Sequence, residues 1–404
     1  MTERLTCDVV VVGAGMVGAA CALYAARAGL AVTVVDRGPV AGGTTGAGEG
    51  NLLVSDKEPG PELELALLSN RLWAELAAEP GLGPAFEYEA KGGLVVASTP
   101  DGLGALEDFA AGQRSAGVTA ESVAAHQLTD LEPHLAPGLA GGVHYPQDAQ
   151  VMPTLAAAHL VRASGARLLT GRTVTEVLRA ADGTVRGVRT DRGDIHAPAV
   201  VNAAGTWGGE LAALAGVGLP VLPRRGFVLV TEPLPPLVRH KVYAADYVAD
   251  VASDSAALQT SPVVEGTAAG PVLIGASRER VGFDRSFSLP VVRALAAGAT
   301  RLFPFLERVR AMRTYLGFRP YMPDHLPAIG PDPRVPGLFH ACGHEGAGIG
   351  LATGTGRLIA QVLGGKTPDL DLTPFRPDRF EEHEEDYEGD EGDEGDEGDE
   401  GDAA

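Results

Sequence analysis

The sequence predicts an α/β fold made of two interleaved domains. One carries a parallel βαβ unit, and the other is an α+β domain built on a mostly antiparallel sheet. Three observations lead to this expectation. The chain opens with a strand–helix–strand pattern around a glycine-rich turn, its middle is rich in short strand patterns, and a second glycine-rich loop follows an apolar run near the end. At 404 residues, the chain is also long enough for two cores.

The βαβ unit occupies the first 36 residues. Cys7–Val12 is a β-branched run typical of a buried parallel strand. Ala19–Gly29 is rich in alanine and ends in glycine, which predicts a helix with its stop signal, and Ala31–Val35 predicts the second strand. The sequence therefore places a glycine-rich turn between the first strand and the first helix.

The rest of the chain alternates between the two expected domains. We expect residues 1–85, 148–220 and 325–380 to form the first domain, and residues 86–147 and 221–324 to form the second, which should supply most of a substrate cavity. The expected helices are Glu62–Ala78, 101–116, Thr154–Ser164 and Leu289–Leu302. The expected strands are 93–97, several within Arg167–Asn202, and Arg224–Thr231, Val242–Val251 and Pro271–Ser277.

Charge and cysteine usage restrict the functional classes. The formal net charge is −21, but residues 381–404 hold fifteen acidic residues and no Lys or Arg, which leaves −6 for the body. The tandem EGD tail is expected to be disordered. The body has no basic stripe for nucleic acid and no apolar run long enough to span a membrane. Three scattered cysteines fit neither a disulfide framework nor a zinc site, and with no secretory pattern at the start they favour the cytoplasm and no metal.

The first glycine-rich turn matches a dinucleotide-binding fingerprint. Gly13, Gly15 and Gly18 follow the G-x-G-x-x-G spacing of a Rossmann-like domain, between the predicted strand and helix. The helix N-terminus would face a pyrophosphate with its partial positive charge. Asp36 ends the second strand, where an acidic side chain meets the adenosine ribose. This turn alone does not distinguish NAD from FAD.

The second glycine-rich loop favours the longer cofactor. Residues 343–356 read GHEGAGIGLATGTG and lead into a helical pattern. A reduced flavin accumulates negative charge on its ring, far from the adenosine end, and a second helix N-terminus would stabilise that charge. The two loops therefore predict FAD, with one loop at each end of the cofactor.

Together with these loops, three further stretches carry a resemblance that covers about residues 5–380. GGTTGAGEGN occupies residues 42–51 and VVNAAGTWGGEL occupies residues 200–211, and GFRPYMPDHLPAIGP precedes the second loop. The chain resembles the FAD-dependent D-amino acid oxidase and glycine/sarcosine oxidase superfamily. Within it, the chain is most similar to the group that contains subunits of opine oxidase and of hydrogen cyanide synthase, together with D-hydroxyproline dehydrogenase. This resemblance implies oxidation of a C–N bond in a small amino acid, imino acid or opine, with electrons passing to partner subunits.

The resemblance also implies a set of site residues. Arg319, in the G-x-R-P stretch, is expected to bind the substrate carboxylate, which a planar guanidinium can hold with two parallel hydrogen bonds. Tyr247 is expected to complete the carboxylate clamp, with Tyr243, Tyr315 and Tyr321 as alternatives. His344 and Glu345 are expected either beside the flavin ring or in hydrogen bonds within the loop itself. The expected cofactor contacts are Gly13, Ala14, Gly15, Met16, Val17, Gly18, Asp36, Arg37, Thr44, Thr45, Gly48, Glu49, Gly50, Asn51, Val174, Ala204, Gly205, Trp207, Gly343, His344, Gly346, Gly348 and Ile349.

The expected reaction is hydride transfer from the amine-bearing carbon to flavin N5, with Arg319 orienting the substrate and no obligatory general base. Two alternatives stay open: an oxidase that reduces oxygen to peroxide, and a flavin subunit that relays electrons without a substrate site. Sarcosine oxidases attach their flavin through a cysteine near the segment that matches 317–327, and this chain has none there. Non-covalent FAD is therefore expected.

Overall fold

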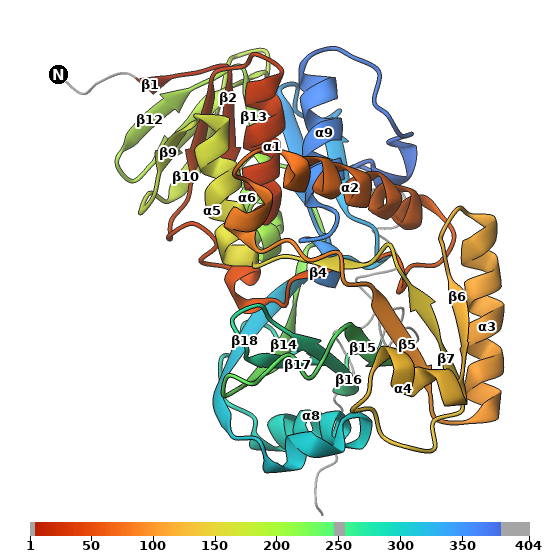
Figure 1. The fold of residues 1–404 in the computed structure, drawn as a ribbon. Coiled ribbons are helices and arrows are strands. Elements are labelled where there is room, and N and C mark those ends of the chain that lie inside the picture. The colour runs from red at the N-terminus through yellow and green to blue at the C-terminus, as the bar shows by residue number, and fades with distance from the viewer. Residues whose placement is uncertain (1–4, 246–254, 381–404) are drawn as a thin grey trace, which may run out of the picture.

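The computed structural model describes residues 5–245 and 255–380. The acidic tail at 381–404, the end of the strand expected at Val242–Val251, and Tyr247 lie outside these ranges. Figure 1 shows the described chain as two stacked layers of sheet and helix.

The first layer is built on a sheet with the order β19-β20-β13-β2-β3-β9 among the described residues. Its strands are β2 (Val9–Val12), β3 (Val32–Val35), β9 (Arg167–Leu169), β13 (Ala199–Asn202), β19 (Ala328–Pro331) and β20 (Leu338–Cys342). All neighbours pair in parallel except β19 and β20. Strand β2 is valine throughout and buried, as expected of a parallel strand that is covered on both faces.

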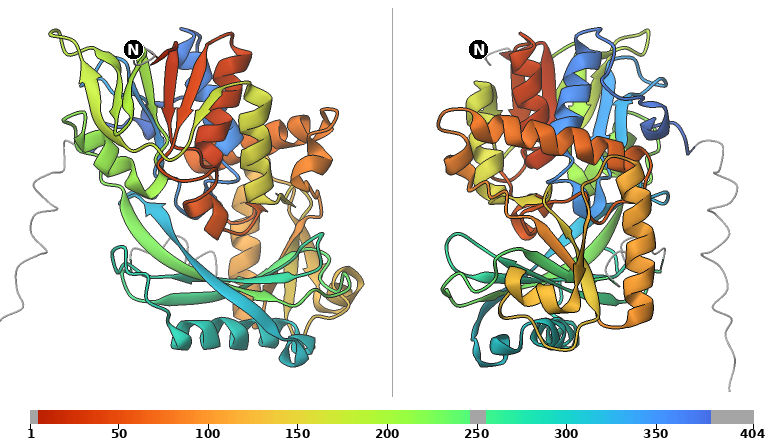
Figure 2. Two further views of the ribbon diagram at one scale, coloured as in Figure 1. Left: turned by 90° about the vertical axis from the view of Figure 1, so that its left-hand side faces the viewer. Right: turned by 45° about the vertical axis from the view of Figure 1, so that its right-hand side comes forward.

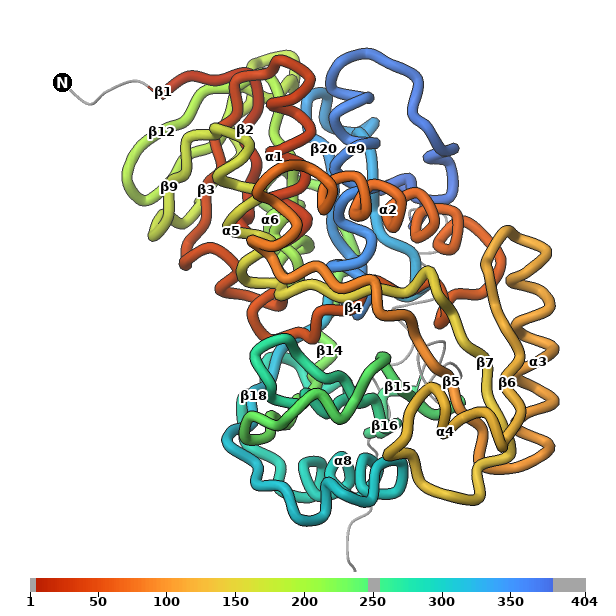
Figure 3. Tube along the Cα trace, viewed as in Figure 1, coloured from red at the N-terminus to blue at the C-terminus, as the bar shows by residue number. Residues whose placement is uncertain are grey.

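Helices from both ends of the chain cover this sheet. They are α1 (Met16–Arg27), α2 (Pro61–Ala78), α5 (Pro153–Ser164), α6 (Gly208–Ala213) and α9 (Ala352–Leu363). Helices α1 and α9 lie side by side, so the N-terminal and C-terminal segments meet in one layer (Figure 3). Gly356 on α9 permits this approach, because a Cβ there would lie less than 3.0 Å from the backbone of Ala20 on α1.

The second layer is a sheet with the order β18-β14-β17-β16-β15-β5-β7-β6 among the described residues. Its strands are β5 (Gly93–Ala97), β6 (Glu121–Ala124), β7 (Gly141–Tyr145), β14 (Leu222–Thr231), β15 (Lys241–Ala244), β16 (Gln259–Gly266), β17 (Val272–Arg278) and β18 (Ala311–Tyr321). Its described neighbours pair antiparallel, except for the parallel pair β15 and β5. Helix α8 (Leu289–Leu302) covers the face turned away from the first layer, and the long strands β14 and β18 extend toward that layer (Figure 2).

Smaller elements complete the described chain. A smaller sheet beside the first layer has the order β1-β12-β11-β10 among the described residues. In addition, β4 pairs with β8. These strands are β1 (Leu5–Thr6), β4 (Asn51–Leu52), β8 (Ala149–Gln150), β10 (Val174–Arg179), β11 (Val185–Thr190) and β12 (Gly193–His196). The remaining described α-helices are α3 (Pro100–Ser115) and α4 (Leu128–Leu131). Within the described ranges, no helix is long and apolar enough to cross a bilayer.

The α/β class with a mostly antiparallel second sheet is confirmed. The domain boundaries stay a prediction, although the strands of 93–145 and 222–321 do share one sheet. Strand β18 is absent from the expected elements, because Gly317 and Pro320 break the apolar alternation that identifies a strand. It lies at the end of its sheet, where the missing proline N–H removes no ladder bond. Helix α1 also begins three residues before the expected start at Ala19.

Candidate active site

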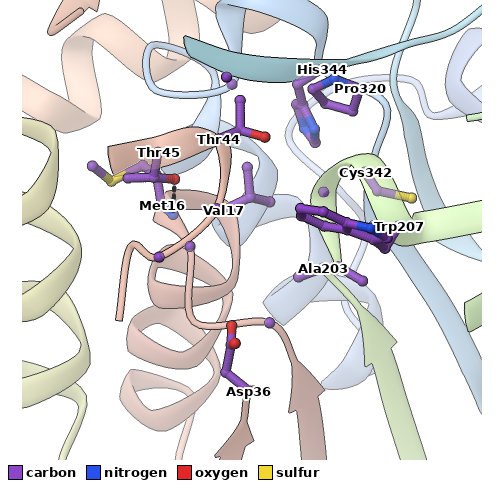
Figure 4. Close-up of a pocket in the computed structure, with 18 of the residues that line it drawn as sticks. Met16, Val17, Asp36, Thr44, Thr45, Ala203, Trp207, Pro320, Cys342 and His344 are labelled. Atoms are coloured by element: carbon purple, nitrogen blue, oxygen red, sulfur yellow. Dashed lines mark hydrogen bonds between the residues drawn. The ribbon is translucent and has the colours of Figure 1, made fainter. Parts of the chain in front are cut away.

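A cavity of about 460 Å³ is lined by residues of both layers. Its walls come from both glycine-rich loops, from the ends of β2, β3 and β13, and from the strands β14 and β18. In Figure 4, Asp36 lies at one end of the labelled side chains and His344 at the other, with Val17, Ala203 and Trp207 between them. Residues more than 300 positions apart in the sequence therefore share one hollow.

The first loop passes so close to its neighbours that only glycine fits. Gly13 has a φ of +118°, and a Cβ there would lie less than 3.0 Å from the Ala203 carbonyl oxygen. A Cβ at Gly18 would meet the Gly13 carbonyl in the same way. These glycines bring the turn, the helix α1 and the strand β13 together, and they leave backbone rather than side chains at the cavity wall.

Asp36 fixes this turn from the end of β3. Its carboxylate accepts hydrogen bonds from the backbone N–H of Ala14 at 2.7 Å and of Gly38 at 2.7 Å, and it lines the cavity. The backbone N–H of Met16, at the start of α1, donates to Thr45 Oγ1 at 2.9 Å (Figure 4). The side chains of two loops thus hold the N-terminal end of α1 in place.

A carbonyl on β18 joins three separate segments beside the cavity. The Phe318 carbonyl accepts hydrogen bonds from the Thr44 hydroxyl at 2.6 Å and the Thr206 hydroxyl at 2.7 Å. The two hydroxyl oxygens are 3.2 Å apart. Because Phe318 precedes Arg319, these bonds fix the backbone that carries the predicted substrate anchor.

Arg319 lies on the cavity wall, and its guanidinium is held by a hydrogen bond to the backbone of β17. Its Nη1 donates to the Ser277 carbonyl of β17 at 2.8 Å. Gly226 on the neighbouring strand provides the space, because a Cβ there would lie less than 3.0 Å from Arg319 Nη1 and from the Ser277 oxygen. Gly317, which pairs with Gly226, also lines the cavity. The sheet therefore offers a floor of glycines next to one oriented guanidinium.

The second loop returns to the cavity through a strained turn. Gly343 has a φ of +83°, and Glu345 has a φ of 44°, which is uncommon for a residue with a side chain. Glu345 pairs with the buried Arg224 at 3.4 Å and with His325 Nδ1 at 3.0 Å. Burial lowers the pKa of Arg224, although the charge of Glu345 opposes this. Helix α9 begins at Ala352, after the last lining residue of this loop, Ile349.

His344 is buried at the cavity wall and neutral at physiological pH. Its Nε2 lies 2.9 Å from the hydroxyl of Thr355, which itself donates to the Leu351 carbonyl. Nε2–H is therefore the donor to Thr355. Burial lowers the pKa of His344 from 6.5 to about 3. This ring binds its own helix and borders the cavity at the same time.

His344 should make the protein sensitive to mild acid. Below pH 6.5, His344 is protonated in the unfolded chain but stays neutral in the folded protein. The free energy of unfolding is therefore highest above pH 6.5 and decreases as the pH falls toward 3. The loss should be about 1.4 kcal/mol per pH unit, or roughly 2 kcal/mol at pH 5. We expect His344→Gln, which keeps an N–H donor, to flatten the decline measured by denaturant unfolding between pH 7.5 and 5. Exposed His126→Gln should leave it unchanged, and an identical decline in His344→Gln would contradict this assignment.

Most of the predicted site residues border the cavity. Those that line it are Gly13, Gly15, Met16, Val17, Asp36, Arg37, Thr44, Thr45, Gly48, Glu49, Asn51, Val174, Ala204, Gly205, Trp207, Arg319, His344, Gly346, Gly348 and Ile349. Their contacts with a cofactor or substrate stay predictions.

The structure places a few predicted residues behind the lining. Ala14 points its N–H at Asp36, while Gly18, Gly50 and Gly343 are backbone packing positions where a Cβ would approach Gly13, Val151 and Met322, respectively, to less than 3.0 Å. The described tyrosines also lie off the lining. Tyr243 donates to Ser55, the Tyr315 hydroxyl lies 3.3 Å from the Gly48 carbonyl, and Tyr321 packs under Arg224 and Arg280.

The sequence interpretation missed several residues in the cavity wall or directly behind it, of which Gly226 lines the cavity. Thr206, Gly226 and the Phe318 carbonyl hold Arg319 in place without appearing among the predicted site residues. Gly226 had a usable signal, because a glycine inside an apolar strand pattern indicates a close approach by another group. The Phe318 carbonyl had no such signal in the sequence, because every residue carries a backbone carbonyl.

The residues present fit a long flavin nucleotide. At one end, backbone from the Gly13 turn and the N-terminus of α1 suit phosphates. At the other end, the loop that contains Gly346 and Gly348 exposes backbone next to Arg319, and Trp207 lies in the wall between them. The described residues would hold the two ends of FAD in one continuous hollow.

Comparisons with known proteins agree with this fit. A model of the FAD dependent oxidoreductase (DAO) family matches residues 8–362. Hydrogen cyanide synthase subunit HcnC of Pseudomonas aeruginosa is 32% identical, over 93% of this chain and 97% of its own length. The crystal structure of glycine oxidase from Geobacillus kaustophilus has a TM-score of 0.84 at 29% identity and covers 93% of this chain and 99% of its own. Iminodiacetate oxidase from Chelativorans has a TM-score of 0.77 at 26% identity, with coverage of 92% and 99%.

The cysteines favour a flavin that is not covalently attached. Cys342 ends β20 at the cavity wall, but burial raises the pKa of its thiol to about 12, which suppresses the nucleophilic thiolate. Burial also raises the pKa of Cys21 to about 12. We expect acid precipitation to release the yellow colour into the supernatant. Colour retained in the washed pellet, and still present in a Cys342→Ser control, would place the attachment at another residue.

Proposed function

The chain belongs to the DAO family of FAD-dependent oxidoreductases, and from this premise we propose that it oxidises the C–N bond of a small amino acid, imino acid or opine. It is an enzyme that uses FAD. The observation that carries the proposal is that Arg319, a cation suited to a carboxylate, lines the same cavity as both glycine-rich loops.

The described residues perform the binding and orientation. Arg319 would grip the substrate carboxylate, and its bond to Ser277 keeps the guanidinium plane fixed before the substrate arrives. Gly226 leaves room for the guanidinium itself, and both Gly226 and Gly317 line the cavity beside it. Bound FAD would supply the two-electron acceptor. We assign no general base, because the buried His344 donates its Nε2–H to Thr355 and has a pKa of about 3.

The relatives support this substrate class. The names of the similar proteins include glycine oxidase and iminodiacetate oxidase, and both substrates carry a carboxylate next to an amine. HcnC is named as a subunit, which supports an electron-accepting partner protein for this chain. Cytoplasmic location stays a prediction from the cysteine usage.

The decisive experiment is anaerobic reduction of the holoprotein. A panel of glycine, sarcosine, D-proline, D-hydroxyproline, iminodiacetate and an opine is added in turn, and bleaching of the flavin band is recorded. At least one of these compounds should bleach the flavin band as fast as the enzyme turns that compound over. If none does, the C–N oxidation proposal fails and an electron-relay role gains support.

The electron acceptor is tested with the compound that bleaches the flavin. In air, stoichiometric peroxide identifies an oxidase. Bleaching with little peroxide identifies a dehydrogenase, whose electrons leave through a partner subunit or another acceptor.

A further inference from the structure

We infer that Glu49 binds the amino group of the substrate, opposite the carboxylate that Arg319 binds. This inference rests on the proposed function and names a second substrate-binding residue for it. The sequence analysis placed Glu49 among the cofactor contacts, but its surroundings point to a different ligand.

Glu49 is a buried carboxylate on the cavity wall. It is 8% exposed and lines the same hollow as Arg319. Its Oε1 makes no hydrogen bond to any part of the chain that the structure describes, while Oε2 accepts a bond from Asn51 at 3.3 Å. A buried carboxylate oxygen without a donor costs free energy, so a ligand that brings a donor to this side chain is favoured.

The charges around Glu49 call for one more cation. Lys241 Nζ lies 2.8 Å from Glu265 and 3.8 Å from Glu49, and both Lys241 and Glu265 are 1% exposed. Next to them, Lys91 pairs with Glu89 at 3.5 Å. Glu265 takes the closer contact with Lys241, so these groups leave one carboxylate in excess. An ammonium in the cavity would balance it, since buried charges are stable only when paired.

The hydroxyl of Tyr315 is affected by the same excess negative charge of Glu49 and Glu265. It lies 3.3 Å from the carbonyl of Gly48, the residue before Glu49. Burial raises the pKa of Tyr315, and the charges of Glu49 and Glu265 raise it further. The region around Glu49 therefore favours a cation and disfavours an additional anion.

The two proposed anchors contact neighbouring positions of one strand. Arg319 binds the Ser277 carbonyl, and Glu49 lies over Gly275, where a Cβ would come within 3.0 Å of its carboxylate. Gly275 and Ser277 are two residues apart on β17. A guanidinium and a carboxylate held over two positions of one strand match the two opposite charges of an amino acid zwitterion. The substrate class this selects is an α-amino or α-imino carboxylate rather than an α-hydroxy acid.

The test compares two ligands that differ in the amine alone. α-Aminoisobutyrate has a carboxylate and an ammonium but no α-hydrogen to lose, and pivalate replaces the ammonium by methyl. Their dissociation constants are measured by calorimetry on the FAD holoprotein. The wild type should bind α-aminoisobutyrate at least ~10-fold more tightly than pivalate, as a charged hydrogen bond would provide. Glu49→Gln should remove most of this preference while the pivalate constant changes less than about threefold.

Two further variants separate direct contact from general charge. Glu89→Gln removes a negative charge from the same group of residues but leaves the Glu265–Lys241 pair in place. Its side chain is absent from the cavity lining, so this variant should keep the preference for the amine. Glu49→Asp retains the charge, and it should keep part of the preference even if Glu49→Gln folds poorly. Thermal melts of every variant show whether it is folded.

Three results would overturn the assignment. They are a wild type without preference for α-aminoisobutyrate, equal weakening of both ligands in Glu49→Gln, and weaker FAD binding by apo-Glu49→Gln with the amine preference intact. The last result would return Glu49 to the cofactor. Failure of the proposed function looks different, because no compound of the amino acid panel would then bleach the wild-type flavin.

Discussion

Arg319→Ala is expected to lower kcat/KM for the amino acid substrate by about 10² to 10⁴, while FAD stays bound. Two charged hydrogen bonds to a carboxylate are worth about 1.5–3 kcal/mol each, and each 1.4 kcal/mol is a tenfold change. The effect should be large because Arg319 lines the cavity and its guanidinium is already oriented by Ser277. Arg319→Lys should recover little, since an ammonium cannot form the two parallel bonds. Steady-state kinetics with the best compound of the panel measures both variants.

The matched control is Arg313→Ala. Arg313 lies on the same strand, is exposed, and is not among the lining residues. It should retain near wild-type kcat/KM. Unchanged turnover in Arg319→Ala would remove this residue from substrate binding and favour a flavin subunit without its own substrate site. A colourless Arg319→Ala protein would instead indicate a role in holding the cofactor.

Gly13→Ala is expected to give a protein that does not retain FAD and unfolds more readily. Alanine is strained at a φ of +118°, and its Cβ would collide with the Ala203 carbonyl. Strain and overpacking together should cost about 2–5 kcal/mol of unfolding free energy. The displaced turn would also withdraw the backbone that is predicted to face the cofactor. Flavin absorbance after gel filtration and denaturant unfolding of the apoprotein measure the two effects separately.

Gly29→Ala is the control for backbone strain alone. Gly29 has a φ of +91°, but a Cβ there would meet nothing within 4 Å. This variant should lose only about 1–2 kcal/mol and should remain yellow. If Gly13→Ala behaves like Gly29→Ala, the close approach to Ala203 is not what makes glycine necessary.

The sequence predicted the parts of the site that depend on local patterns. The first loop was accessible because glycine spacing, a valine strand and Asp36 follow a fixed geometry. The loop at 343–356 was accessible because few structures other than a ligand-binding wall need so many glycines before a helix. Both loops do border one cavity, and the mostly antiparallel second sheet was also expected.

The missed features depend on pairing between distant segments. Strand β18 gave no clear strand signal, yet its pairing with β14 places Gly226 under the Arg319 guanidinium. The hydroxyls of Thr44 and Thr206 meet at a backbone carbonyl, which no residue type reveals. The excess negative charge at Glu49 arises only when Glu49, Lys241 and Glu265 come together in the folded chain. Such features need the tertiary structure.

The contact between α1 and α9 has a consequence for which substitutions can alter the cavity. Gly356 packs on the backbone of Ala20, so the spacing between the two cavity-lining loops depends on a contact whose residues do not line the cavity. Substitutions at this contact would shift both cavity-lining loops at once. Surveys restricted to residues that touch the ligand would overlook this source of change.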